Sequence, residues 1–110
     1  MFMPDTLTIL RELKQLLQTH FHDDIQDVVL FGSQAAGSAR KDSDYDVLII
    51  LNKDNYDWKY REHICHLIYE LEIEYDILID MHIISTYELA HTLRGAQPIF
   101  INAIRQGIYA

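Results

Sequence analysis

An unbroken apolar run at residues 47–51, Val-Leu-Ile-Ile-Leu, comes directly after an acidic stretch. A strand with one face in water alternates apolar and polar residues, whereas a strand buried on both faces reads as a continuous apolar run. Residues 44–51 are therefore predicted to form a strand with helices on both sides of its sheet. Apolar runs at 28–31 and 75–85 predict two further strands. The expected class is α/β or α+β.

The segments between these predicted strands show the periodicity of helices. Leucines at spacings of three and four predict an amphipathic helix over residues 6–19, with Asp5 as its N-cap. A second helix is expected over 56–72, a closing helix over 98–106, and short helices over 34–39 and after Ser85 or Thr86. The apolar stripe of the 56–72 helix is predicted to hold Trp58, Ile64, Cys65, Ile68 and Leu71, with Cys65 filling core space.

Length and charge limit the classes of protein that this chain can represent. Its 110 residues predict one domain over 1–110, and its 49% apolar content excludes a disordered chain. A net charge of -8 argues against an extended nucleic-acid surface, because such surfaces neutralise many phosphates with Lys and Arg. No apolar stretch approaches a membrane span, no leader is recognisable, and Cys65 has no partner for a disulfide, so a cytoplasmic protein is expected.

The most informative residues are three aspartates. Asp44 and Asp46 lie two apart at the start of a predicted strand, so their side chains share one face. Asp80 stands inside the apolar run of the third strand, where an unpaired buried carboxylate is costly. We therefore expect the third strand to lie beside the second, so that Asp80 joins Asp44 and Asp46 in holding a divalent cation such as Mg²⁺. Asp76 shares the strand face of Asp80 and ranks second, because it lies at the strand entrance.

Gly32 and Ser33 end the first predicted strand and open a short helix, an arrangement that exposes backbone N–H groups to a phosphate. A P-loop is excluded, because Ser38 follows Gly37 where that motif requires lysine. Carboxylates that hold metal beside a phosphate-binding turn favour phosphoryl or nucleotidyl transfer with two metal ions.

The histidines do not indicate zinc. The pairs His20 with His22 and His63 with His66 lack a third ligand at a suitable spacing and are interpreted as surface residues. His82 lies two residues after Asp80 and can hydrogen-bond its carboxylate.

Three motifs together resemble the minimal nucleotidyltransferases of the DNA polymerase β superfamily. They are Phe31-Gly32-Ser33, Ser43-Asp44-Tyr45-Asp46-Val47 and Ile79-Asp80-Met81. The resemblance implies a small mixed β-sheet flanked by helices. It also implies that Asp44, Asp46 and Asp80 are the catalytic and metal-binding residues, and that the NTP, for preference ATP, binds at Gly32, Ser33, Ser43 and Arg40. Many relatives carry arginine where this chain has Ala36, and Arg40 is the expected substitute.

The resemblance further implies transfer of a nucleoside monophosphate, often AMP, to a hydroxyl acceptor. Small members of this kind are often paired with a HEPN-type helical protein and act as antitoxins that modify the toxin. Two alternatives stay open from the residues: a non-catalytic protein that neutralises a partner by covering it, and an acidic domain that only sequesters a cation. An open site on a chain of this size is also compatible with a homodimer.

Overall fold

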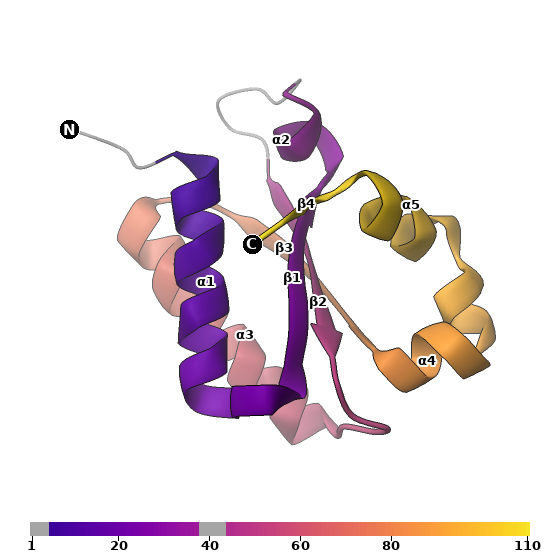
Figure 1. Cartoon of the computed structure of the whole chain (residues 1–110). Helices are drawn as coiled ribbons and strands as arrows, with labels where there is room; N and C mark the ends of the chain where they lie inside the picture. Colours follow the sequence, from indigo (N-terminus) through magenta and orange to yellow (C-terminus); the bar gives the residue numbers. More distant parts are fainter. Residues whose placement is uncertain (1–4, 38–43) are drawn as a thin grey trace.

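The computed structural model describes residues 5–37 and 44–110, which form one layered arrangement of helices around a sheet (Figure 1). In chain order the elements are α1 (Thr6–Phe21), η1 (His22–Asp24), β1 (Ile25–Phe31), α2 (Gly32–Ala36), β2 (Tyr45–Leu51), α3 (Trp58–Tyr75), β3 (Ile79–Ser85), α4 (Thr86–His91), η2 (Leu93–Ala96), α5 (Pro98–Gln106) and β4 (Ile108–Tyr109).

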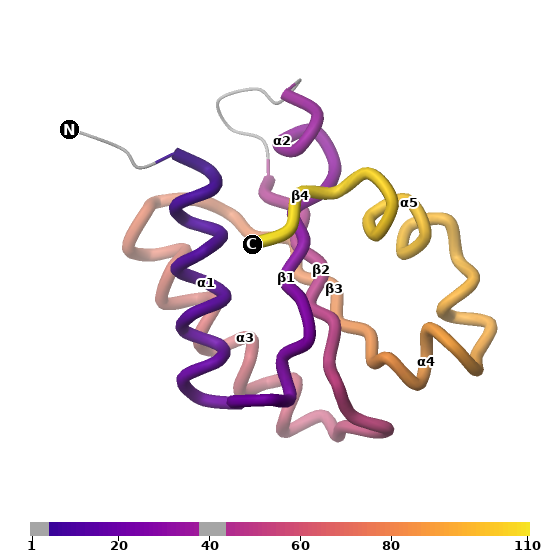
Figure 2. Tube along the Cα trace, in the orientation of Figure 1, coloured from indigo at the N-terminus to yellow at the C-terminus, as the bar shows by residue number. Residues whose placement is uncertain are grey.

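The strands form one mixed sheet in the order β3-β2-β1-β4. β1 is antiparallel to both β2 and β4, whereas β2 and β3 are parallel and are joined by the crossover helix α3. The predicted mixed sheet flanked by helices is confirmed. The two-residue strand β4 has no counterpart in the sequence prediction, because so short a segment carries no periodicity; in the tube view it lies against β1 (Figure 2).

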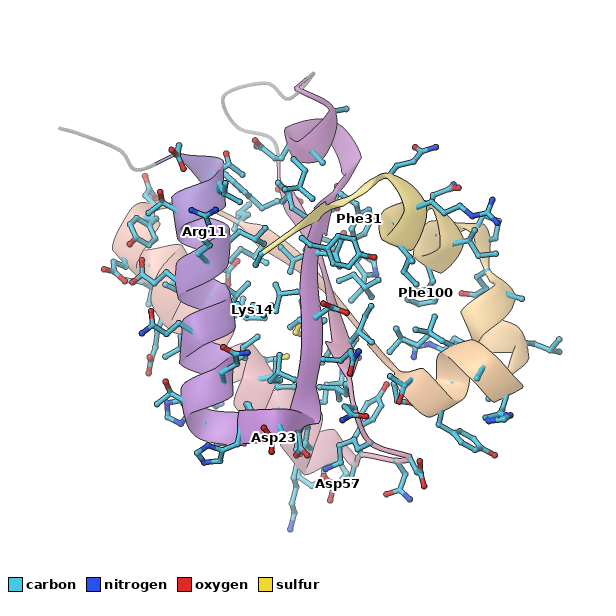
Figure 3. The ribbon with its side chains drawn as sticks, in the orientation of Figure 1. Arg11, Lys14, Asp23, Phe31, Asp57 and Phe100 are labelled. Carbon is cyan, nitrogen blue, oxygen red and sulfur yellow. The ribbon has the colours of Figure 1, made fainter. Side chains whose placement is uncertain are left out.

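Each face of the sheet has its own core. α1 and α3 cover one face, and their leucines and isoleucines pack on the odd-numbered residues of β2, Val47, Ile49 and Leu51. α4 and α5 cover the other face, where Leu48 and Ile50 of β2 pack with Phe100. Figure 3 shows Phe31 and Phe100 on the α5 side of β1. The continuous apolar run of β2 is therefore explained by helices on both faces.

The predicted apolar stripe of α3 is partly wrong. Ile64, Ile68 and Leu71 are buried as expected, but the Trp58 residue is 68% exposed and Cys65 lies on the surface. The face that packs on the sheet is the line through Ile64, Ile68 and Leu71, and both wrong assignments lie off this line. Cys65 instead lies 4.0 Å from Met81, from sulfur to sulfur, at the edge of the sheet.

The outer edge of β3 is held by side chains at both ends. The Ile79 N–H donates to the Glu72 carboxylate at 2.9 Å, and the Ile83 carbonyl accepts from the Arg94 guanidinium at 2.6 Å. Arg94 also pairs with Glu88 at 2.7 Å, and this pair fixes η2 against α4. Burial disfavours the charged form of Glu88, but the hydrogen bonds from Arg94 and Tyr56 outweigh it and lower the pKa of this carboxyl.

Among the helices within residues 5–37 and 44–110, none combines the length and the apolar content that a bilayer crossing requires.

Candidate functional site

The site begins with a row of residues across three strands. Phe31 of β1 pairs with Asp46 of β2, and Asp46 pairs with Asp80 of β3. Neighbouring residues in one row project to the same face of a sheet, so both carboxylates lie on the face that α4 and α5 cover. Oxygen atoms of Asp46 and Asp80 and a ring nitrogen of His82 all lie within 4.8 Å of one another. The structure thus brings together two of the three predicted aspartates.

Contrary to the sequence prediction, Asp80 is not buried inside its strand. β3 begins only at Ile79, so Asp80 is the second residue of the strand, and its side chain is 54% exposed. The apolar residues before it do not extend the strand, because α3 continues to Tyr75 and residues 77 and 78 form a connection. Asp80 therefore meets Asp46 at the open end of the parallel strands, where an external ligand can reach both.

Asp46 has an unfavourable environment for its negative charge. Partial burial raises the pKa of this carboxyl, and a hydrogen bond to Asp80 and the charge of Asp80 raise it further. The charge of Asp44 acts in the same direction, whereas His82 opposes it. A cation between the carboxylates would relieve the repulsion, which for two unit charges ~4 Å apart lies between about 1 kcal/mol in bulk water and about 4 kcal/mol near a protein surface.

Asp44 and Asp76 occupy different positions from the pair. Asp44 is exposed and precedes the first residue of β2; its charge reaches Asp46, but it is not among the side chains whose donor atoms lie within 4.8 Å. Asp76 is not a strand residue: it ends α3 in a left-handed conformation, with φ of 53°. The predicted sharing of a face between Asp76 and Asp80 is therefore wrong.

Gly32 is built into the site by two constraints. Its φ is +74°, a conformation that favours glycine, and a Cβ atom at this position would lie 2.2 Å from a carboxylate oxygen of Asp46. The backbone at the start of α2 can thus approach Asp46 closely only because residue 32 has no side chain. Ser33 follows in the first turn of α2 and is partly buried. Ser43 and Arg40, the other two predicted phosphate-binding residues, lie outside the described residues.

His82 connects the carboxylates to β1. Its Nε2 lies 3.3 Å from an oxygen of Asp80, and its ring packs on the Phe31 ring with centroids 5.5 Å apart. These contacts restrict the orientation of the Asp80 side chain. The contact with Phe31 was not predicted, because the two residues are far apart in the chain and no sequence signal links them.

Comparison with known proteins identifies the class. The sequence model that defines the nucleotidyltransferase domain family matches residues 8–99. The chain therefore belongs to this family and is a nucleotidyltransferase enzyme. A relative from Methanocaldococcus jannaschii, named "Putative protein adenylyltransferase MJ0141", is 35% identical over 75 residues, which cover 68% of this chain and 75% of the relative.

Two solved structures share the fold. Both are crystal structures of mutants of the toxin-antitoxin MntA-HpeT, with TM-scores of 0.59 and 0.60 and sequence identities of 23% and 21%. The matches cover 91% and 90% of this chain and 69% of each solved chain. The predicted family and fold are confirmed.

Proposed function

We propose that this enzyme uses Mg²⁺ held by Asp46, Asp80 and Asp44 to transfer AMP from ATP to a hydroxyl group of a partner protein. One observation carries the proposal. The carboxylates of Asp46 and Asp80 meet at the open end of two parallel strands, with the backbone of Gly32 against Asp46. Such a site offers carboxylate oxygens for metal beside N–H groups for phosphate.

The donor atoms suit magnesium. Mg²⁺ prefers oxygen ligands and retains several waters, so two carboxylates with a third nearby are an adequate set for one or two ions. Partial burial and the neighbouring Asp80 carboxylate raise the pKa of Asp46, and a cation held between the two carboxylates would offset this repulsion. His82 is better placed to orient Asp80 by a hydrogen bond than to serve as a ligand for so hard an ion.

In the proposed reaction the acceptor oxygen forms a bond to the α-phosphorus of ATP as the bond from that phosphorus to the α,β-bridging oxygen breaks. Pyrophosphate leaves with the electron pair, and the proton of the acceptor hydroxyl passes to the Asp80 carboxylate. Asp80 suits this step because it is the more exposed of the pair. Bound Mg²⁺ would neutralise phosphate charge and favour the ionised acceptor. The N–H groups at Gly32 and Ser33 would orient the triphosphate.

The choice of ATP and of a protein acceptor rests on the relatives. The archaeal relative is named as a protein adenylyltransferase, and the solved structures come from a toxin-antitoxin pair. These names support a partner protein as the acceptor, and the resemblance to minimal nucleotidyltransferases implies that this partner is a HEPN-type helical protein.

The test compares label transfer from ATP labelled at the α- or the γ-phosphate to a candidate HEPN-type helical protein. With Mg²⁺, only the α-label should reach the acceptor, and chelation by EDTA should stop transfer. Asp46→Asn and Asp80→Asn should each reduce the rate at least a hundredfold, because each removes a carboxylate that would hold the Mg²⁺ opposite the transferring phosphate. Asp80→Asn also removes the proposed proton acceptor. The rate of transfer by Asp44→Asn shows how much the third, exposed carboxylate contributes to the reaction.

Asp76→Asn is the matched control, because it makes the same change in an exposed aspartate whose left-handed conformation asparagine tolerates. It should retain full activity. Transfer that persists in Asp46→Asn would contradict the proposed catalysis. Neutralisation of the partner without any transfer, unchanged in Asp46→Asn, would instead support the non-catalytic alternative.

A further inference from the structure

A groove of about 340 Å³ opens between α2 and α5 on the same face of the sheet as Asp46 and Asp80. Phe31 of β1, Gly32 at the start of α2 and Ala103 of α5 are among the residues that line the groove. The volume lies within the range of pockets that bind small molecules. The groove is therefore large enough for a substantial part of a nucleotide.

The chemistry of the groove suits a neutral ligand. On α2 it is lined by two small apolar residues, Ala35 and Ala36. Its wall on α5 carries two amide side chains, Asn102 and Gln106, four residues apart on one side of the helix. Among the described residues that line it, none is charged. An amide offers both a hydrogen-bond donor and an acceptor, which matches a base or a sugar better than a phosphate.

The groove is continuous with the carboxylate site. Gly32 lines the groove and is also the residue whose backbone approaches the Asp46 carboxylate. Phe31 lines the groove and contacts His82, which bonds to Asp80. Within residues 5–37 and 44–110, a ligand whose phosphates lie at Gly32 and Asp46 can therefore place its neutral part between α2 and α5.

The geometry points to this groove as the subsite for the nucleoside of the NTP, with Asn102 and Gln106 reading the base. This inference rests on the proposed function, because it assigns the part of ATP that the carboxylates do not hold. An amide can donate to N7 of adenine and accept from its N6 amino group at the same time. Guanine presents two acceptors, N7 and O6, along the same edge, so a single amide satisfies it less well. The groove should thus favour ATP over GTP.

The experiment measures binding of ATP, GTP and inorganic tripolyphosphate in the presence of Mg²⁺ by calorimetry. Asn102→Leu and Gln106→Leu should each weaken ATP binding by roughly tenfold, the effect of one or two lost hydrogen bonds, and should reduce the preference for ATP over GTP. Binding of tripolyphosphate should change less than twofold. Gln18→Leu, an amide exposed on α1 on the other side of the sheet, is the matched control and should change neither ligand.

Photo-crosslinking of the wild-type protein with 8-azido-ATP gives a second measurement that does not depend on the variants. Mass spectrometry should locate the label on peptides of α2 or α5, and excess ATP should prevent it. Label confined to other elements would overturn the inference, as would variants that weaken ATP and tripolyphosphate equally or leave ATP binding unchanged. Wild-type protein that binds ATP in the groove but transfers no AMP would refute the proposed function while the subsite stands.

Discussion

The two faces of the sheet differ in the residues that the same strand, β2, presents on them. On the α1 and α3 side, β2 presents Val47, Ile49 and Leu51, all fully covered by helices. On the α4 and α5 side, β2 begins with Asp46 and becomes apolar only at Leu48. The period of two along a strand thus separates a face devoted to packing from a face that combines packing with chemistry. We therefore expect that substitutions on the two faces change stability and activity independently.

The largest stability effect is expected on the packing face. Leu17 of α1 is completely buried in the core beneath α1 and α3. Leu17→Ala should lower the free energy of unfolding by about 2–5 kcal/mol, since it removes buried methyl groups and leaves a cavity. Denaturant unfolding measures this loss, and Mg²⁺ affinity of the folded variant should equal that of the wild type. A folded Leu17→Ala protein with weakened Mg²⁺ binding would show that the two faces are coupled.

An intermediate effect is expected at the glycine turn on the chemical face. Gly32 and Gly37 both have φ of +74°, but an added Cβ would meet Asp46 only at Gly32, and at Gly37 nothing lies within 4 Å. Gly37→Ala should cost about 1 kcal/mol for the left-handed backbone alone. Gly32→Ala should cost about 1–3 kcal/mol and should also reduce AMP transfer at least tenfold, because it displaces the Asp46 carboxylate. Equal activity of the two variants would show that the contact with Asp46 has no role.

The smallest effect on stability should be a gain. Asp46→Asn removes one of two facing charges, so the metal-free variant should be more stable than the wild type by about 0.5–1 kcal/mol at pH 7. Because the pKa of Asp46 is raised in the folded state, the wild-type penalty exists above that pKa and is relieved as the pH falls through it. The gain should therefore shrink on acidification. Thermal unfolding with and without Mg²⁺ measures it, and Mg²⁺ should stabilise the wild type more than the variant.

The sequence predicts the fold well because its strong signals are local. The apolar run of β2 and the periodicity of α1 determine the layers. The expectation that β3 lies beside β2, with Asp80 next to Asp46, comes from the need of the Asp80 carboxylate for a partner, and the register of the two strands confirms it. What the sequence could not provide depends on where elements end. The surface position of Asp80 follows from a late start of β3, and the helical position of Asp76 follows from the length of α3. The groove at Asn102 was not predicted, because it forms between segments about 70 residues apart in the chain.

The side chains that hold the outer edge of β3 affect how this protein associates with other molecules in a concentrated solution. An open strand edge is a template on which a strand of another molecule can extend the sheet. Here Glu72 blocks one end of that template and Arg94 the other, each through a hydrogen bond that involves a charged group. An invading strand would have to displace both before it could pair along the whole edge, so these two charges protect the protein against growth of its sheet into aggregates.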